Sequence, residues 1–172
     1  MRRLGLIVSA GAALALVACG SSEADEANAE APAAEESAAS TAEPAEPIEY
    51  VKDIGLLEDG FGDTLNARLA AFHEESGHEI RIAVILTTDD QDIEEKAAEM
   101  IASNGISDNG ALILIAAADE HVGIVPASGA AAALDDAFTD AAEAAMAAKF
   151  DAGDVTDGFN GAVDAIIERL SS

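Results

Sequence analysis

Apolar positions between residues 60 and 110 recur at helical spacing in two stretches, and each stretch is bounded by a capping signal. The first predicts a helix from Thr64 to Ser76, with Asp63 as its N-cap and Gly77 at its end. The second predicts a helix that begins after Asp92 and ends before Gly105. The domain therefore contains amphipathic helices that bury one face each.

Three further stretches read as buried or half-buried strands. They are "EIRIAVILTT" (79–88), "ALILIA" (111–116) and "HVGIV" (121–125). A strand, a helix and a second strand with short connections form a βαβ unit, so the first two strands are expected to be parallel. Only "AADE" separates the second strand from the third, which predicts an antiparallel hairpin and a mixed sheet.

Two more helices are expected after the last strand. One runs from about residue 130 or 134 to 148, and the other runs from 157 to 170, where apolar residues again repeat at helical spacing. Helices on both sides of a mixed sheet make a three-layer α/β/α sandwich. The predicted fold class is therefore α/β, with a parallel βαβ unit and one antiparallel hairpin strand.

The first 18 residues have the pattern of a secretory signal. A basic start, "MRR", precedes an apolar run from Leu4 to Ala18, which is shorter than the ~20 residues that span a bilayer. The run "LVAC" resembles the lipobox of bacterial lipoproteins, in which cleavage leaves cysteine first and acylation follows. Cys19 is the single cysteine, so it has no internal disulfide partner. An incidental cysteine in an ordinary signal peptide is the alternative.

Residues 20–47 carry acidic residues and no Lys or Arg, and their only β-branched residue is Thr41. Such a segment buries too little apolar surface to fold, and it is expected to act as a tether. The predicted organisation is a lipoprotein signal peptide at 1–18, an acylated Cys19 with an acidic tether at 19–47, and an α/β domain at 48–172.

The charge of the chain restricts its partners. Asp and Glu number 34 against 8 Lys and Arg, which gives a formal net charge of −26. A polyanion repels nucleic-acid phosphates and anionic headgroups, so nucleic-acid binding is excluded, and cations or basic partners are attracted. His73, His78 and His121 do not match a metal-binding spacing and are interpreted as surface histidines.

Carboxylates are the best candidates for chemistry. The sequence lacks a Gly-x-Ser-x-Gly elbow, a Walker loop and a His-Glu-x-x-His motif. Asp108 lies in "SDNG" before the second predicted buried strand, and Asp135 and Asp136 lie at the start of the third helix. These three acids are the candidate metal ligands. The competing interpretations are an Asx turn at Asp108 and helix capping by Asp135 or Asp136.

The order of these segments resembles that of the TPM domain, also called the TPM phosphatase family, over about residues 50 to 170. The most specific elements are "DIGLL", "DNGALILIA" and "GDVTDGFNGAVDAI". The resemblance implies an α/β/α sandwich. Members of the family are reported as acid phosphatases, as calcium-binding proteins, as photosystem repair factors or as receptor auxiliary proteins.

The resemblance also implies a site. The aspartate of the family's Asp-Asn-Gly loop corresponds to Asp108, and a second family aspartate corresponds to Asp136. Leu134 and Gly129 match the segment before it, but Ala131 replaces the family's glutamate, Ala127 replaces a glycine, and Asn104 replaces a tryptophan. Because calcium takes six to eight oxygen ligands, losing one carboxylate predicts weak calcium binding and feeble phosphatase activity.

The expected function is that of a lipid-anchored protein of the bacterial cell envelope. It faces the periplasm, is held in the membrane through Cys19, and acts as a cation-responsive or protein-partner-binding module. Ser21, two positions after the cysteine, favours the outer membrane over the inner one by resemblance to lipoprotein sorting rules. The alternatives are a metal-dependent acid phosphatase, in which Asp108 and Asp136 hold the metal, and a purely structural lipoprotein.

Overall fold

The computed structural model describes residues 48–172, which contain four strands and four helices. In chain order these are β1 (Val51–Lys52), α1 (Phe61–Ser76), β2 (Ile80–Ile85), α2 (Ile93–Ser103), β3 (Ala111–Ala116), β4 (His121–Pro126), α3 (Asp136–Asp151) and α4 (Val155–Leu170). The predicted signal peptide, Cys19 and the predicted tether lie outside the described residues. None of the described helices has the length and apolar character needed to cross a membrane.

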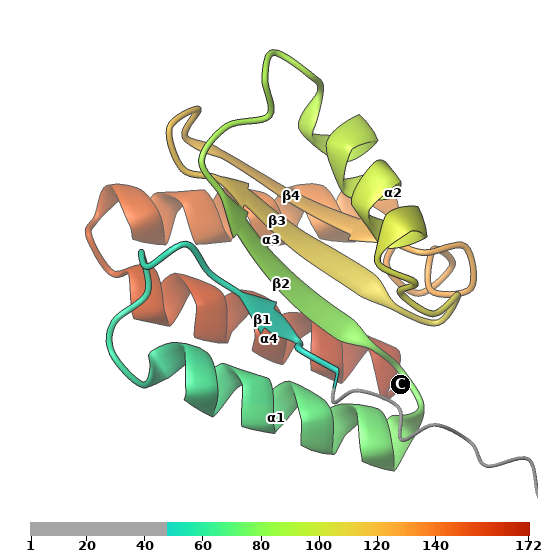
Figure 1. Cartoon of the computed structure of the whole chain (residues 1–172). Helices are drawn as coiled ribbons and strands as arrows, with labels where there is room; N and C mark the ends of the chain where they lie inside the picture. Colours follow the sequence, from blue (N-terminus) through green and yellow to red (C-terminus); the bar gives the residue numbers. More distant parts are fainter. Residues whose placement is uncertain (1–47) are drawn as a thin grey trace, which may run out of the picture. The chain divides into compact units, whose positions relative to one another are not determined.

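The sheet has the strand order β1-β2-β3-β4 (Figure 1). β1, β2 and β3 are parallel, and β4 pairs antiparallel with β3 in the register that brings Ala111 opposite Pro126. The predicted βαβ unit and hairpin are therefore confirmed. We call the edge of the sheet where β2 and β3 end its carboxyl edge, and the edge where they begin its amino edge.

Helices cover both faces of the sheet, as the sandwich prediction requires. α1, α3 and α4 lie on one face and α2 lies on the other, where it packs on β3 and β4 (Figure 1). The larger core joins β-strand residues such as Ile82 and Ile113 to Leu69 of α1 and Phe159 of α4. A smaller core places Leu112 and Leu114 against Ala97 of α2. β3 is buried at every position because both layers cover it.

Three predicted helix boundaries are wrong by a few residues. α1 begins at Phe61 with Gly60 as N-cap, so Asp63 lies in the first turn and not at the cap. Gly60 adopts a φ of 80°, which a residue with a side chain rarely adopts. α3 begins at Asp136, two residues after the later predicted start of 134, and not at 130, because Ala130–Ala133 form turns. α4 begins at Val155 rather than at residue 157.

β1 was not predicted. It is two residues long, so it offers no alternation that could be recognised in the sequence. Tertiary contacts hold this segment in place. The N–H of Tyr50 donates to Asn66 Oδ1 of α1 at 2.8 Å, and the N–H of Ile82 donates to the Tyr50 carbonyl at 2.8 Å.

Candidate functional site

The amino edge of the sheet carries the predicted acidic residues. β4 runs antiparallel, so it ends where β3 begins, and the segment after β4 meets the loop before β3. The N–H of Gly129 donates to the Asp108 carbonyl at 2.7 Å, and Ser128 Oγ lies 3.4 Å from Asp108 Oδ1. A Cβ at Gly129 would lie 2.8 Å from that carbonyl oxygen, so glycine permits this close approach. Antiparallel pairing thus joins two loops that are distant in sequence.

Asp135 and Asp136 lie at the same edge, at the start of α3. The carboxylate of Asp135 accepts from the N–H of Phe138 at 3.0 Å, which makes Asp135 the N-cap. It also lies 3.6 Å from the guanidinium of Arg169, which itself donates to the Ala133 carbonyl at 2.8 Å. Asp136 is exposed in the first turn. Asp135 thus has a structural role of its own.

Within residues 48–172, no group of three or more Asp, Glu, His or Cys side chains is arranged to hold a metal ion. The histidines make separate contacts. His73 Nδ1 lies 2.7 Å from the Tyr50 hydroxyl, His78 Nδ1 lies 3.1 Å from the Asn109 carbonyl, and His121 is exposed. His78 therefore helps to position the loop that contains Asp108.

A buried carboxylate supports the same loop. Glu79 is 3% exposed, pairs with the Arg81 guanidinium, and accepts from the N–H of Ser107 at 2.8 Å. Burial acts to raise the pKa of Glu79, but the Ser107 hydrogen bond and Arg81 outweigh it and hold that pKa below its ordinary value. The folded state thus favours the charged form of Glu79, which supports the loop through its hydrogen bond from Ser107.

The carboxyl edge is held together by Asp119, in the turn between β3 and β4. Its carboxylate accepts from the N–H of Thr88 at 2.7 Å and from the Thr87 hydroxyl at 3.0 Å. The N–H groups of Ala117 and Ala118 donate to the Ile85 and Leu86 carbonyls at 2.9 and 2.7 Å. These contacts fix the hairpin turn beside the end of β2. The hydrogen bond from Thr88 lowers the pKa of Asp119.

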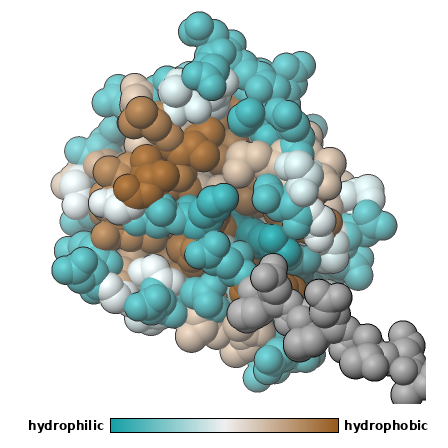
Figure 2. Space-filling view, viewed as in Figure 1, coloured by the Kyte–Doolittle hydropathy of each residue, from teal (hydrophilic) through white to brown (hydrophobic). Residues whose placement is uncertain are grey.

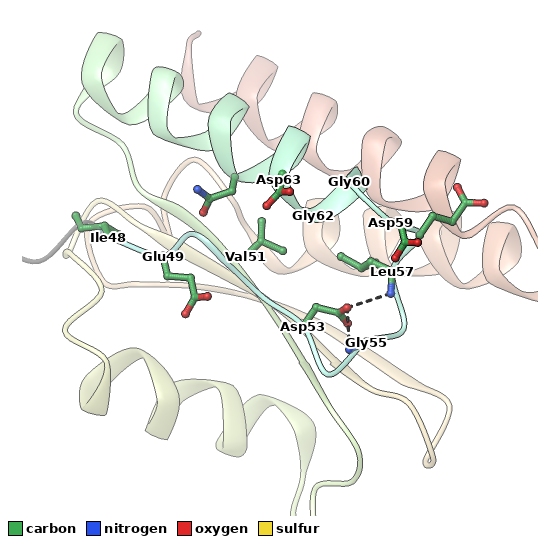
Figure 3. Close-up of a pocket in the computed structure, with 12 residues that line it drawn as sticks. Ile48, Glu49, Val51, Asp53, Gly55, Leu57, Asp59, Gly60, Gly62 and Asp63 are labelled. Atoms are coloured by element: carbon green, nitrogen blue, oxygen red, sulfur yellow. Dashed lines mark hydrogen bonds between the residues drawn. The ribbon is translucent and has the colours of Figure 1, made fainter.

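Asp53 organises the loop that follows β1. Its carboxylate accepts from the N–H groups of Gly55, Leu56 and Leu57 at 2.9 to 3.1 Å. Figure 3 shows the hydrogen bonds from Gly55 and Leu57. Burial acts to raise the pKa of Asp53, but these backbone hydrogen bonds outweigh it and lower the pKa. The same loop borders an open hollow of about 520 Å³ whose lining includes Glu49, Asp59 and Asp63.

A second cavity, of about 370 Å³, lies at the carboxyl edge and is mainly apolar. We call it the carboxyl-edge pocket. Val84, Ile115 and Phe159 are buried residues that line it. The side chains of Leu57, Val122, Ala147 and Phe150 are half-buried in its walls, while Leu56, Glu120, His121, Asp151 and Val155 are exposed residues of its lining. Ligands of open α/β sheets collect at this edge.

Exposed apolar side chains surround this edge. Ile54 and Leu56 follow β1 and are 51% and 55% exposed, and Leu86 follows β2 and is 63% exposed. Because β1 and β2 are parallel, these residues emerge at the same end of the sheet. Figure 2 shows apolar side chains gathered near the end where β2 and β3 finish, beside α2. This site was not predicted from the sequence, although "DIGLL" and the apolar face of the last helix both contribute to it.

Solved structures support the fold. The N-terminal domain of a protein from P. gingivalis is 20% identical, with a TM-score of 0.65 over 71% of this chain and 82% of that one. The BA42 protein of Bizionia argentinensis is 19% identical, with a TM-score of 0.58 over 70% of this chain and 85% of that one. An N-terminal domain from Corynebacterium glutamicum is 19% identical, with a TM-score of 0.55 over 75% of this chain and 82% of that one.

No curated protein matches the chain. The model of the TPM domain family matches residues 51–169, which is more than half of the chain and nearly all of the described domain. The helices and the mixed sheet agree with that match, and so do the structural neighbours. The chain therefore belongs to the TPM domain family.

Proposed function

We propose that this TPM domain is a binding module of the bacterial envelope, anchored by a lipid on Cys19, and that it contacts a partner protein through the carboxyl edge of its sheet. The observation that supports this function best is the carboxyl-edge pocket with exposed apolar side chains beside it. Exposed apolar residues clustered at a preformed cavity are typical of interaction sites. Membrane attachment follows from the lipobox pattern that ends at Cys19.

Site-specific photo-crosslinking in cells tests this function. A photoreactive amino acid at Val155, which is 38% exposed beside the pocket, is expected to give a discrete adduct in the membrane fraction. The same amino acid at Glu75, which is exposed at the opposite end of the domain, serves as the matched control and should give none. An adduct from Glu75 alone, or none from either position, would contradict a partner at the carboxyl edge.

A weak response to calcium is a second candidate, and the contact between the Gly129 N–H and the Asp108 carbonyl favours it. That contact brings carbonyl oxygens and the carboxylate of Asp108 to the edge where Asp136 lies. We expect dissociation constants near the weak end of extracellular calcium modules, about 10⁻³ M. At ten times that concentration, calcium would stabilise the fold by about 1.4 kcal/mol, a melting shift of roughly 4 to 6 °C.

The calcium proposal is tested by melting at fixed ionic strength, with magnesium as a control for diffuse attraction to the acidic surface. Asp136→Asn should remove the calcium-specific shift. Glu99→Gln, an exposed change on α2, should keep it. Equal shifts in the wild type and in Asp136→Asn would rule out the site. Phosphatase activity, the alternative, is expected to be feeble, and robust turnover that disappears in Asp136→Asn would favour an enzyme instead.

A further inference from the structure

The carboxyl-edge pocket combines an apolar interior with an acidic rim. Its interior is formed by core side chains of the sheet and α4, such as Val84, Ile115 and Phe159. The charged residues in its lining are Glu120 and Asp151, both exposed carboxylates, and its lining has no Lys or Arg. A group that fills this cavity without electrostatic penalty is therefore apolar and carries positive charge where it leaves the pocket.

The volume limits the size of that group. A cavity of about 370 Å³ is at the small end of ligand pockets, and it accommodates one large apolar side chain rather than an extended lipid. Leu56 and Val155 stand at the mouth and remain 55% and 38% exposed. A small molecule confined to the cavity would leave both in water. A polypeptide that crosses the mouth would cover them.

The pocket is also held in a fixed shape before any partner binds. Asp53 orders the loop that places Leu56 and Leu57 on one wall, through three backbone hydrogen bonds. Asp119 ties the β3–β4 turn, which also contributes to the lining, to the segment after β2. Glu120, next to it, adopts a φ of 54°, a left-handed conformation that non-glycine residues hold only where their surroundings impose it. A preformed cavity lowers the conformational cost of binding.

From the cavity, its acidic rim and the exposed residues at its mouth, we propose that the carboxyl-edge pocket receives a large apolar side chain from a partner polypeptide in which basic residues flank that side chain. The proposal rests on the binding function above and names the chemistry of its partner. The formal charge of −26 steers such a basic segment toward the domain, and the apolar pocket then selects among basic segments.

Peptide binding to the full chain in phosphatidylcholine nanodiscs tests the proposal by fluorescence anisotropy. The probe is a short labelled peptide with phenylalanine between lysines. One matched peptide replaces the phenylalanine with serine, and another replaces the lysines with glutamates. We expect the first peptide to bind at least about tenfold more tightly than either control. Equal binding of the phenylalanine and serine peptides would overturn the proposal, because charge alone would then explain it.

Two pairs of variants locate the binding site. Leu56→Ser should weaken binding about tenfold, whereas Ile48→Ser, which changes a similarly exposed apolar residue outside the carboxyl-edge pocket, should not. Asp151→Lys should weaken binding about threefold to tenfold, whereas Glu75→Lys, with the same change in net charge, should have less effect. These positions are exposed, so the fold is expected to survive, and melting curves check this. Equal losses within either pair would overturn the proposal.

The remaining outcomes separate this inference from the proposed function. An adduct at Val155 in cells together with no binding of the basic peptide would preserve a binding module and reject this partner chemistry. Failure of both experiments would reject both. Self-association that Leu56→Ser abolishes would make the occupant a second copy of the chain and overturn the proposal. Stronger binding by a simple alkylammonium ion than by the peptide would also overturn it.

Discussion

At the scale of single residues, carboxylates that accept backbone hydrogen bonds fix the loops of this domain. Asp53, Asp119 and Asp135 each accept from at least one N–H, and Glu79 accepts from Ser107 inside the fold. Composition alone indicates only an acidic, solvated surface. The structural roles of these four residues depend on contacts that single-sequence reasoning does not contain, apart from the cap at Asp135.

Replacing Glu79 should reveal its role clearly. Glu79→Gln leaves Arg81, whose side chain is 18% exposed, without its charge partner, so we expect a loss of about 3 kcal/mol, or roughly 10 °C in the melting temperature. Glu99→Gln, which breaks the exposed pair with Lys96, should change stability by less than about 0.5 kcal/mol. Chemical denaturation of both variants measures the difference. Equal effects would contradict the buried-pair interpretation.

Glu79 should also make the stability of the fold depend on pH in a known direction. The pKa of Glu79 is lowered in the folded state, so ionised Glu79 stabilises the fold fully above the ordinary glutamate pKa of about 4.3. This stabilisation disappears as the pH falls through the pKa of the folded state. The stability difference between the wild type and Glu79→Gln should therefore shrink under acidic conditions. A difference that grows as the pH falls would contradict the lowered pKa.

Glu143 of α3 should behave in the opposite way. Burial raises its pKa most, and Glu94 and Asp140 raise it further, although its carboxylate accepts from the N–H of Ile124 at 2.6 Å. Its charged form is therefore destabilising in the folded state at neutral pH. Glu143→Gln, which keeps an acceptor oxygen, should raise stability at pH 7 by up to about 1 kcal/mol.

The extra stability expected of Glu143→Gln should also depend on pH. Because the pKa of Glu143 is raised in the folded state, the wild type gains stability as the pH falls through that pKa. The extra stability of Glu143→Gln should therefore vanish below the ordinary glutamate pKa of about 4.3. Melting curves across this range test the prediction. A variant that is less stable than the wild type at pH 7 would show that the hydrogen bond to Ile124 requires the charge.

At the scale of elements, periodicity predicted all four helices and the three longer strands. It failed where an element is too short to have a period, as in β1, or where tertiary contacts set a boundary, as at the start of α3. Sheet geometry alone did not bring Asp108 to the same end of the sheet as Asp136, because Asp108 precedes its strand, and only the family resemblance implied a shared site. The antiparallel direction of β4 places both segments at the amino edge. The carboxyl-edge pocket could not be predicted because α3, α4, the sheet and the β1–α1 loop all contribute to it.

Two glycines of α4 allow the contact between α3 and α4 to be tested. A Cβ at Gly158 would lie 2.6 Å from a ring carbon of Phe150, whereas a Cβ at Gly161 would meet nothing within 4 Å. Gly158→Ala should destabilise the domain by about 1–3 kcal/mol through overpacking. Gly161→Ala should stabilise it by up to about 1 kcal/mol through helix propensity. Thermal melting measures both, and destabilisation by Gly161→Ala would contradict this packing.

At the scale of the whole molecule, a TPM domain follows a proposed lipid anchor. We predict that Cys19 is the first residue of the mature protein and is acylated, since the apolar run ends there and the chain has no other cysteine. The intact mass of detergent-extracted protein measures this. Cys19→Ser should lack the added mass of the acyl chains. The mass of an unlipidated chain, or retention of residues 1–18, would contradict the anchor.

Hydrogen–deuterium exchange on the protein in its native membranes, compared with the purified protein in nanodiscs, tests the central claim most directly. A partner at the carboxyl edge should slow exchange at the loop of Leu56 and Leu57 and at Ala117 in the hairpin turn, because these residues line the carboxyl-edge pocket. The loop of Asp108 at the amino edge should exchange equally in both samples. Protection confined to the Asp108 loop, or identical exchange throughout the domain, would contradict a partner-binding site at the carboxyl edge.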